Sequence, residues 1–217
     1  MINQVQTQSV PSTSVTDGSY PAQLGGKSGE GIVAELHGKH FTNSVRGNVF
    51  LGATLAAGVV VPFNAATLAG TFTLHNPAGS GKNIELIDLN VCQVPGTALI
   101  TGLGVGFQGP LASTGGAPTS VTHSAGGVKS LKVGSGVAAS GLLYTVATLT
   151  NVAIANLSPI MWLFNNVATT IITQQYTNYN FDGKVVLPPD TLCTLVNSIT
   201  GTQSAAAISI TWAEFPV

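Results

Sequence analysis

Residues 74–86, LHNPAGSGKNIEL, contain residue types of a nucleotide-binding loop. Such a loop reads GxxxxGK[ST], and its backbone N–H groups, lysine and magnesium-binding hydroxyl lie between a strand and a helix. Gly81 and Lys82 match the pattern, but Asn76 replaces its first glycine and Asn83 replaces its Ser or Thr. The next residues alternate as in a strand, where the loop requires a helix. We therefore predict a turn between two strands, formed by the Asn-Pro and Gly-Ser-Gly steps.

The strand predicted over residues 83–94 should present its side chains alternately on two faces. Glu85 and Asp88 are three residues apart, so we expect them on opposite faces and not as the paired carboxylates that a glycosidase needs. The pattern places Ile87, Leu89 and Val91 on one face and Leu86, Asp88 and Asn90 on the other.

The remaining motifs do not indicate an enzyme. Asp182 precedes Gly183, which predicts a hairpin turn, and Asp190 follows two prolines, which predicts a corner. There is no GxSxG motif, and no histidine stands at a diagnostic spacing from a serine. His37 and His40 in HGKH would suit a metal only on a helix, and no acid or cysteine ligand is close. We expect no catalytic residues, no cofactor and no metal site.

One aromatic cluster has the composition of a recognition site. In QQYTNYNF, the rings of Tyr176, Tyr179 and Phe181 alternate with amides. Tyrosine rings stack on sugars, and neighbouring amides hydrogen-bond to them, so these three residues are candidate contacts for a glycan or a partner protein. The alternative is a strand edge that leads into the turn at Asp182.

The elements that would hold these residues are short strands. No amphipathic helix of ten or more residues is predicted, and turn residues separate the apolar runs. This pattern is typical of an all-β protein with a two-sheet sandwich or a barrel. The expected strands cover residues 48–54, 58–63, 70–75, 83–94, 98–107, 128–133, 141–150, 160–166, 169–179, 184–189, 191–199 and 206–215.

The N-terminal residues differ from the rest in composition. The first 30 residues are rich in Gln, Ser, Thr, Gly and Pro, and such a segment buries too little apolar surface to order by itself. We predict an extended N-terminal arm over residues 1–45 and a single sandwich domain over residues 46–217. A flexible tail without function is the alternative for residues 1–20.

Charge is unusually scarce in the chain. Charged residues make up 7% of the chain and the net charge is −1, so little repulsion keeps copies apart and we expect self-association. The seven cations form no cluster in the sequence, which argues against direct nucleic-acid binding. No apolar run is long enough to cross a membrane, and the N-terminus lacks a secretion signal. Cys92 and Cys193 lie in apolar runs, and we expect two buried thiols in a reducing compartment, with a disulfide between them as the alternative.

Four fragments of the chain resemble structural proteins of tailed bacteriophages. They are ELHGKHFTNSVRGNVF, LHNPAGSGKNIELIDLNV, FDGKVVLPPDTLCTL and the ending ISITWAEFPV. The resemblance implies a jelly-roll β-sandwich in a homotrimer that is made in the host cytoplasm and mounted in a virion. It favours a capsid decoration (cement) protein on the outer surface of the capsid, with the major capsid protein as partner.

Two other functions fit the same resemblance and composition. The first is a tail or head-fibre adhesin, in which the same trimeric sandwich presents Tyr176, Tyr179 and Phe181 to a host glycan. The second is the major shell protein of a small virus. The second fits poorly because such subunits neutralise their genome with a basic arm, whereas Lys27 is the one cation in residues 1–30.

Overall fold

The computed structural model describes residues 39–55, 58–61, 68–94, 102–109, 127–149, 157, 160–165, 176–197 and 204–217, and every structural statement below concerns these residues. By its internal contacts the chain divides into Met1–Phe41 and Thr42–Val217. The predicted arm over residues 1–45 lies almost entirely outside the described residues, so the boundary between arm and sandwich stays a prediction. No helix in the described part is long and apolar enough to cross a membrane.

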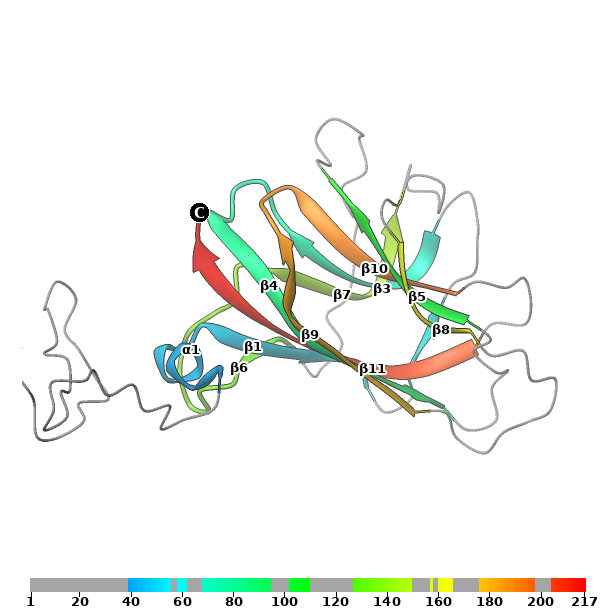
Figure 1. The fold of residues 1–217 in the computed structure, drawn as a ribbon, viewed down its shortest axis with the longest axis horizontal. Helices are drawn as coiled ribbons and strands as arrows, with labels where there is room; N and C mark the ends of the chain where they lie inside the picture. Colours follow the sequence, from blue (N-terminus) through cyan, green and yellow to red (C-terminus); the bar gives the residue numbers. More distant parts are fainter. Residues whose placement is uncertain are drawn as a thin grey trace, which may run out of the picture. The chain divides into compact units, whose positions relative to one another are not determined.

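The described chain forms two antiparallel sheets and one short helix (Figure 1). The first sheet has the order β6-β1-β11-β4-β9, with β2 also paired to β11, and the second has the order β7-β3-β10-β5-β8. The elements are α1 (Phe41–Arg46), β1 (Val49–Ala53), β2 (Val59–Val61), β3 (Leu68–Asn76), β4 (Lys82–Gln93), β5 (Gly102–Gln108), β6 (Lys129–Ser130), β7 (Leu142–Leu149), β8 (Ile160–Asn165), β9 (Tyr176–Leu187), β10 (Thr191–Asn197) and β11 (Ser204–Pro216).

The strand order is that of a jelly roll. Strands β1, β11, β4 and β9 form one set of neighbours and β3, β10, β5 and β8 form the other, and the chain passes between the sheets as it winds. Strand β2 continues the line of β1 along β11, while β6 and β7 each extend one sheet at its edge. The predicted all-β jelly-roll sandwich is therefore confirmed.

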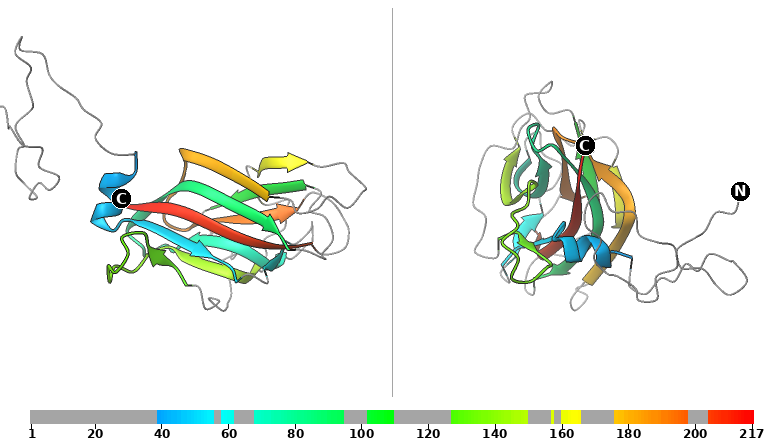
Figure 2. Two further views of the ribbon diagram at one scale, coloured as in Figure 1. Left: turned by 90° about the horizontal axis from the view of Figure 1, so that it is seen from below. Right: turned by 90° about the vertical axis from the view of Figure 1, so that its left-hand side faces the viewer.

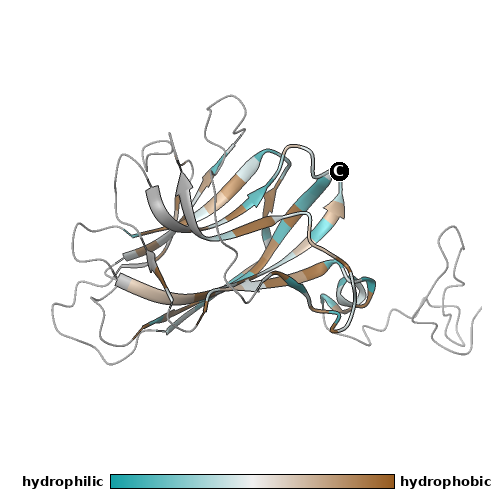
Figure 3. Ribbon diagram, turned by 180° about the vertical axis from the view of Figure 1, so that it is seen from behind, coloured by the Kyte–Doolittle hydropathy of each residue, from teal (hydrophilic) through white to brown (hydrophobic). Residues whose placement is uncertain are grey.

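The core lies between the two sheets and takes alternate residues from each strand. In β11, Ile208, Ile210 and Trp212 are each at most 3% exposed, as the alternation predicts. The ring of Trp212 lies 6.0 Å from that of Phe50 in the neighbouring strand β1. Figure 3 shows the resulting alternation of hydrophobic and hydrophilic residues along the strands. Burial of each side chain of this size stabilises the folded state by about 1.5–3 kcal/mol. The alternation therefore decides which face of each strand turns toward the core.

The segment between β3 and β4 is the predicted turn. Gly81 has a φ of 61°, and the Ser80 N–H donates to the Pro77 carbonyl at 3.0 Å. The Asn76 side chain is buried, and its amide donates to the carbonyls of Lys82 and Leu187, each at 2.8 Å. Strand β4 follows directly, so no helix N-terminus faces this turn and the nucleotide-loop alternative fails.

A bulge in β4 changes which residues share a face. The register against β11 shifts between Thr211 and Trp212, and Ile87 is the extra residue. Leu86 is therefore in the main core, whereas Ile87 belongs to a small apolar cluster with Val49 and Ala213. The predicted grouping of Ile87 with Leu89 and Val91 is wrong, because a bulge restarts the alternation.

The same bulge corrects the prediction for the two carboxylates of β4. Glu85 pairs with Ala213 on one side and Val186 on the other, and Ala213 lies on the outer face. Asp88 accepts a hydrogen bond at 3.3 Å from Asn90, which also lies on the outer face. Glu85 and Asp88 are therefore both on the outer face and not on opposite faces as predicted.

The Asp182-Gly183 step is not a hairpin turn. Both residues have positive φ, 51° and 72°, but they lie inside the continuous strand β9. They form an irregularity opposite the bulge of β4, where the pairing passes directly from Asn180 to Val185. Two runs predicted as separate strands, residues 169–179 and 184–189, therefore contribute to one strand. The predicted chain reversal at Asp182-Gly183 is therefore wrong, because the left-handed residues lie within a continuous strand.

The corner predicted at Asp190 is present. Asp190 has a φ of 67°, and its N–H donates to the Asn76 carbonyl at 2.9 Å. The Thr191 hydroxyl donates to the Pro188 carbonyl at 2.6 Å. These bonds close the connection between β9 and β10 and join it to the end of β3.

Glu214 is a buried carboxylate that links the C-terminal strand to the segment before β7. It is 4% exposed and accepts the N–H groups of Ser140 and Gly141, both at 2.9 Å from their nearer oxygen. The indole N–H of Trp212 donates to the same carboxylate at 3.1 Å. These hydrogen bonds offset the desolvation of the charge and hold the segment before β7 against the core.

We expect Glu214→Ala to lower the free energy of unfolding by about 3 kcal/mol, because buried N–H donors lose their acceptor. Urea denaturation followed by tryptophan fluorescence measures this change. The matched control is Glu85→Ala, a half-exposed carboxylate in the same sheet, and it should cost under about 1 kcal/mol. Equal losses in both variants would contradict the role of Glu214.

The two cysteines are free, but only one of them is buried. Cys193 lies in the core, whereas Cys92 is half-exposed on the outer face of β4, beside Tyr176. The expectation of two buried thiols therefore holds for Cys193 alone. Burial raises the pKa of the Cys193 thiol to about 12, against a smaller opposing effect of the hydrogen bond with the Leu74 backbone. The folded state thus keeps this thiol protonated.

Stability should fall with rising pH because of Cys193. An unfolded cysteine ionises near a pKa of about 8.5, so above this pH the unfolded state loses a proton that the folded state keeps until about 12. From pH 7.5 to 9.5 the free energy of unfolding should fall by about 1.4 kcal/mol more in the wild type than in Cys193→Ala. In Cys92→Ala the free energy of unfolding should fall over this pH range by as much as in the wild type. Urea denaturation at both pH values measures this change. An equal change in the free energy of unfolding in all three proteins would refute the prediction.

Candidate functional site on strand β9

Strand β9 is an edge strand, and its two ends offer two candidate surfaces. Among the described strands it pairs only with β4. From Tyr176 to Phe181 its exposure alternates, with even-numbered residues outward and odd-numbered residues inward. Tyr176 is 64% exposed and Phe181 is 1% exposed. The three predicted contact residues therefore divide between two faces.

Tyr179 and Phe181 point into the sandwich. Their rings meet edge to face with centroids 4.9 Å apart, and the Tyr179 hydroxyl donates to the Met161 sulfur at 3.4 Å. Met161 lies on β8 of the opposite sheet, so this contact joins the sheets. A ligand on the outer face would meet Tyr176 and neither of the other two rings. Because side chains alternate between the two faces of a strand, the even position 176 and the odd positions 179 and 181 lie on opposite faces.

The outer face carries a polar network around Tyr176. The Tyr176 hydroxyl donates to the Asn90 side-chain oxygen at 2.8 Å, and the Asn178 amide donates to the same oxygen at 2.6 Å. The Asn90 amide in turn donates to the Asp88 carboxylate at 3.3 Å. Two members, Asn90 and Asp88, belong to β4 and were not grouped with the aromatic cluster in the sequence, because only strand pairing brings them beside β9.

This network presents groups that can bind a polar ligand. It offers one exposed aromatic ring, two amides and one carboxylate, which together suit a neutral polar surface such as a sugar or a polar protein face. No group of three or more His, Cys, Asp or Glu residues with metal-binding spacing occurs in the described part of the chain. Of the HGKH motif, His37 lies outside the described residues, as does His123.

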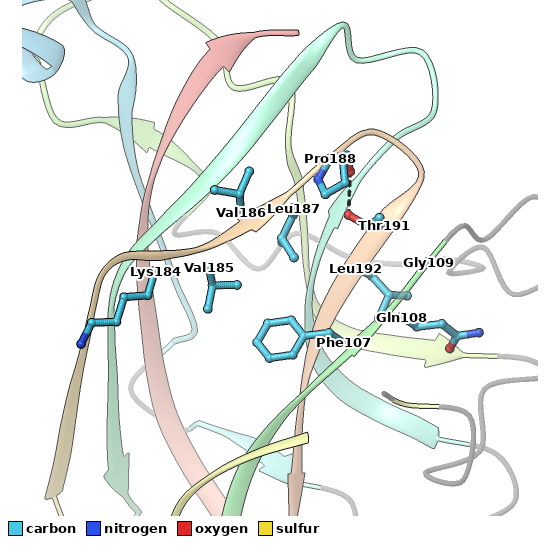
Figure 4. A pocket seen from close by; sticks show the side chains of 10 residues that line it. All are labelled: Phe107, Gln108, Gly109, Lys184, Val185, Val186, Leu187, Pro188, Thr191 and Leu192. Carbon is cyan, nitrogen blue, oxygen red and sulfur yellow. Dashed lines mark hydrogen bonds between the residues drawn. The ribbon is translucent and has the colours of Figure 1, made fainter. Parts of the chain in front are cut away.

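A cleft opens at the other end of β9, between the edges of the two sheets (Figure 4). Its volume is about 320 Å³. Phe107 follows Gly106, whose pairing with Ile160 is the last described pair of β5 with β8, and its ring points into the cleft, toward Val185. The lining residues are Phe107, Gln108, Gly109, Lys184, Val185, Val186, Leu187, Pro188, Thr191 and Leu192.

The cleft is mainly apolar. Lys184 is its one ionisable lining residue, and its ammonium group points away from the cavity in Figure 4. The Thr191 hydroxyl is already engaged with the Pro188 carbonyl at 2.6 Å. Small-molecule sites have convergent polar groups that orient their ligand, whereas the side chains of Gln108 and Lys184 both point away from the ring of Phe107 in Figure 4. The cleft is thus a weaker candidate than the outer face.

The comparisons with known proteins identify no relative of this chain. No protein-family model, no curated protein and no solved structure matches it.

The division of the aromatic cluster predicts different costs for its members. Phe181→Ala should lower the free energy of unfolding by about 3–4 kcal/mol, because it leaves a cavity in the core. Tyr176→Ala should lower it by about 0.5 kcal/mol, since the ring is largely exposed. Urea denaturation measures both. A Tyr176→Ala loss as large as that of Phe181→Ala would contradict the assignment of Tyr176 to the surface.

Proposed function

We propose that the chain is a structural protein of a bacteriophage virion, a trimeric capsid decoration (cement) protein that bridges capsid subunits on the outer surface of the head. The proposal rests on the resemblance of four sequence fragments to phage structural proteins and on the character of the outer face of the first sheet. Its partners are then further copies of itself and the major capsid protein.

The observation that carries the proposal is the outer face of the first sheet, where most outward side chains are small or amides and the carboxylates of Glu85 and Asp88 are among the few charges. The outward positions of β11 and its neighbours are small or amide side chains, such as Ala207, Ser209, Asn90 and Asn178. Such side chains pack closely against another protein with little cost of burying charge. Charged residues make up only 7% of the whole chain, which supports the same proposal.

The mechanism is an increase in the area buried across the joints of the shell. Internal genome pressure pulls capsid subunits apart, and a subunit seated across a joint must be detached before the joint opens. A stable protein interface buries on the order of 1,200–2,000 Å² in total, which a sheet face and an extended segment together can supply. No catalytic group is needed for this function.

The alternative function is host binding by a tail or head-fibre protein. Tyr176 supports it, because an exposed ring held in place by Asn90 resembles a platform for a sugar. Only Tyr176 of the three candidate rings would serve in this role, since Tyr179 and Phe181 face the core side.

The location of the protein in the particle tests the proposal. We expect electron microscopy of purified virions, with gold-labelled antibody against the protein, to show label on heads, and a particle reconstruction to show threefold density over capsid joints. Heads that lack the protein should release their genome at a lower temperature, and added protein should restore the wild-type temperature. Label confined to tails would refute the cement function and favour the adhesin, and absence from the particle would refute both.

A further inference from the structure

A third surface, at the end of the sandwich formed by α1 and β6, has a composition unlike the other described surfaces. We call it the α1–β6 patch. It combines three cations with three apolar side chains, and all six are exposed. Its members are Val45, Arg46, Lys129, Leu131, Lys132 and Val133.

Backbone pairing holds the two parts of the patch together. The Leu131 N–H donates to the Val49 carbonyl at 2.8 Å, and the Ser130 hydroxyl donates to the Gly47 carbonyl at 3.2 Å. Strand β6 pairs with β1, and β1 follows α1 directly in the chain. Figure 2 shows α1 beside the segment that follows β6 in both views.

The apolar members are unusually accessible for their size. Val133 is 94% exposed, Val45 is 44% exposed and Leu131 is 41% exposed. Exposed valine and leucine side chains grouped on one surface are typical of an interaction site.

Among the described residues, α1, β6 and the segment after β6 contain no acid beside these cations. The described acids are Glu85, Asp88, Asp182, Asp190 and Glu214, and all lie on β4, β9, β11 or the β9–β10 connection. Three of the seven cations of the chain are thus gathered at one end of the sandwich. A partner that fits this patch must carry carboxylates next to apolar side chains.

The chain itself contains a segment of that chemistry. Residues 28–36, SGEGIVAEL, carry Glu30 and Glu35 on either side of Ile32 and Val33. We propose that this segment of a second copy docks on the α1–β6 patch, with its carboxylates facing the cations and its apolar side chains covering Val133 and Leu131. The inference rests on the self-association included in the proposed function, but not on any location in a virion.

A second copy is the better source of this segment than the same chain. The patch lies at the C-terminal end of α1 and beyond it, so the chain's own segment would have to turn back along the helix to reach it. A second copy approaches without that constraint, and the contact then links subunits head to tail, as a closed ring of copies requires.

Charge reversal with full-length protein tests the docking. The patch variant is Arg46→Glu with Lys132→Glu, and the segment variant is Glu30→Lys with Glu35→Lys. The matched control, Lys82→Glu with Lys184→Glu, makes the same change in net charge outside the patch. Analytical ultracentrifugation measures self-association of each protein, and circular dichroism checks that each is folded.

We expect the patch and segment variants each to associate at least tenfold more weakly than wild type, and the control to associate like wild type. A mixture of the two variants, one of them labelled with a fluorophore, should regain association in part, because opposite charges then meet at two of the three contacts of a mixed trimer. Added salt should weaken the wild-type contact.

Three results would overturn the inference. Wild-type association in both variants would show that the patch and the segment do not meet. Weak association in both variants without recovery in the mixture would place the segment on its own chain. A wild-type protein that stays monomeric would remove the self-association as well, and so would also count against the proposed trimer.

Discussion

The first sheet depends on the pairing of β11, the C-terminal strand, with both of its neighbours. Strand β11 hydrogen-bonds to β4 along one edge and to β1 and β2 along the other, so it is the centre of this sheet. It also supplies Trp212 to the core and Glu214 to the segment before β7. Because its partners lie far away in the sequence, the sheet cannot close until the last residues of the chain have paired, and such non-local pairing makes folding slow.

The irregularities of β4 and β9 determine what the outer face presents. The bulge at Ile87 moves that side chain into an outer apolar cluster and brings Asp88 and Asn90 to the same face as Glu85. Opposite it, the left-handed residues Asp182 and Gly183 absorb the mismatch without ending β9. A bulge of this kind re-aims side chains while it keeps the sheet intact. The polar network around Tyr176 therefore follows from strand pairing, and not from the order of residues in one segment.

The three described surfaces differ in chemistry. The outer face near Tyr176 is polar and nearly uncharged, the cleft beside Phe107 is apolar, and the α1–β6 patch is basic and apolar. In the proposed function, these three surfaces would let the sandwich contact its own copies and other proteins at once. A subunit of an assembly needs this combination, because its contacts with its own copies must not compete with its contacts to other proteins.

The sequence alone determined the all-β class, the order of the strands along the chain, the turn at Gly81 and the inward alternation of Ile208, Ile210 and Trp212, because these follow from local turn chemistry and a period of two. It could not determine the bulge at Ile87, the continuity of β9 through Asp182, or the buried acceptor role of Glu214. Each of these depends on a partner distant in the sequence. The same reason explains the candidate site: the chain order grouped Tyr176 with Phe181, whereas pairing with β4 placed Tyr176 beside Asn90 and left Phe181 in the core.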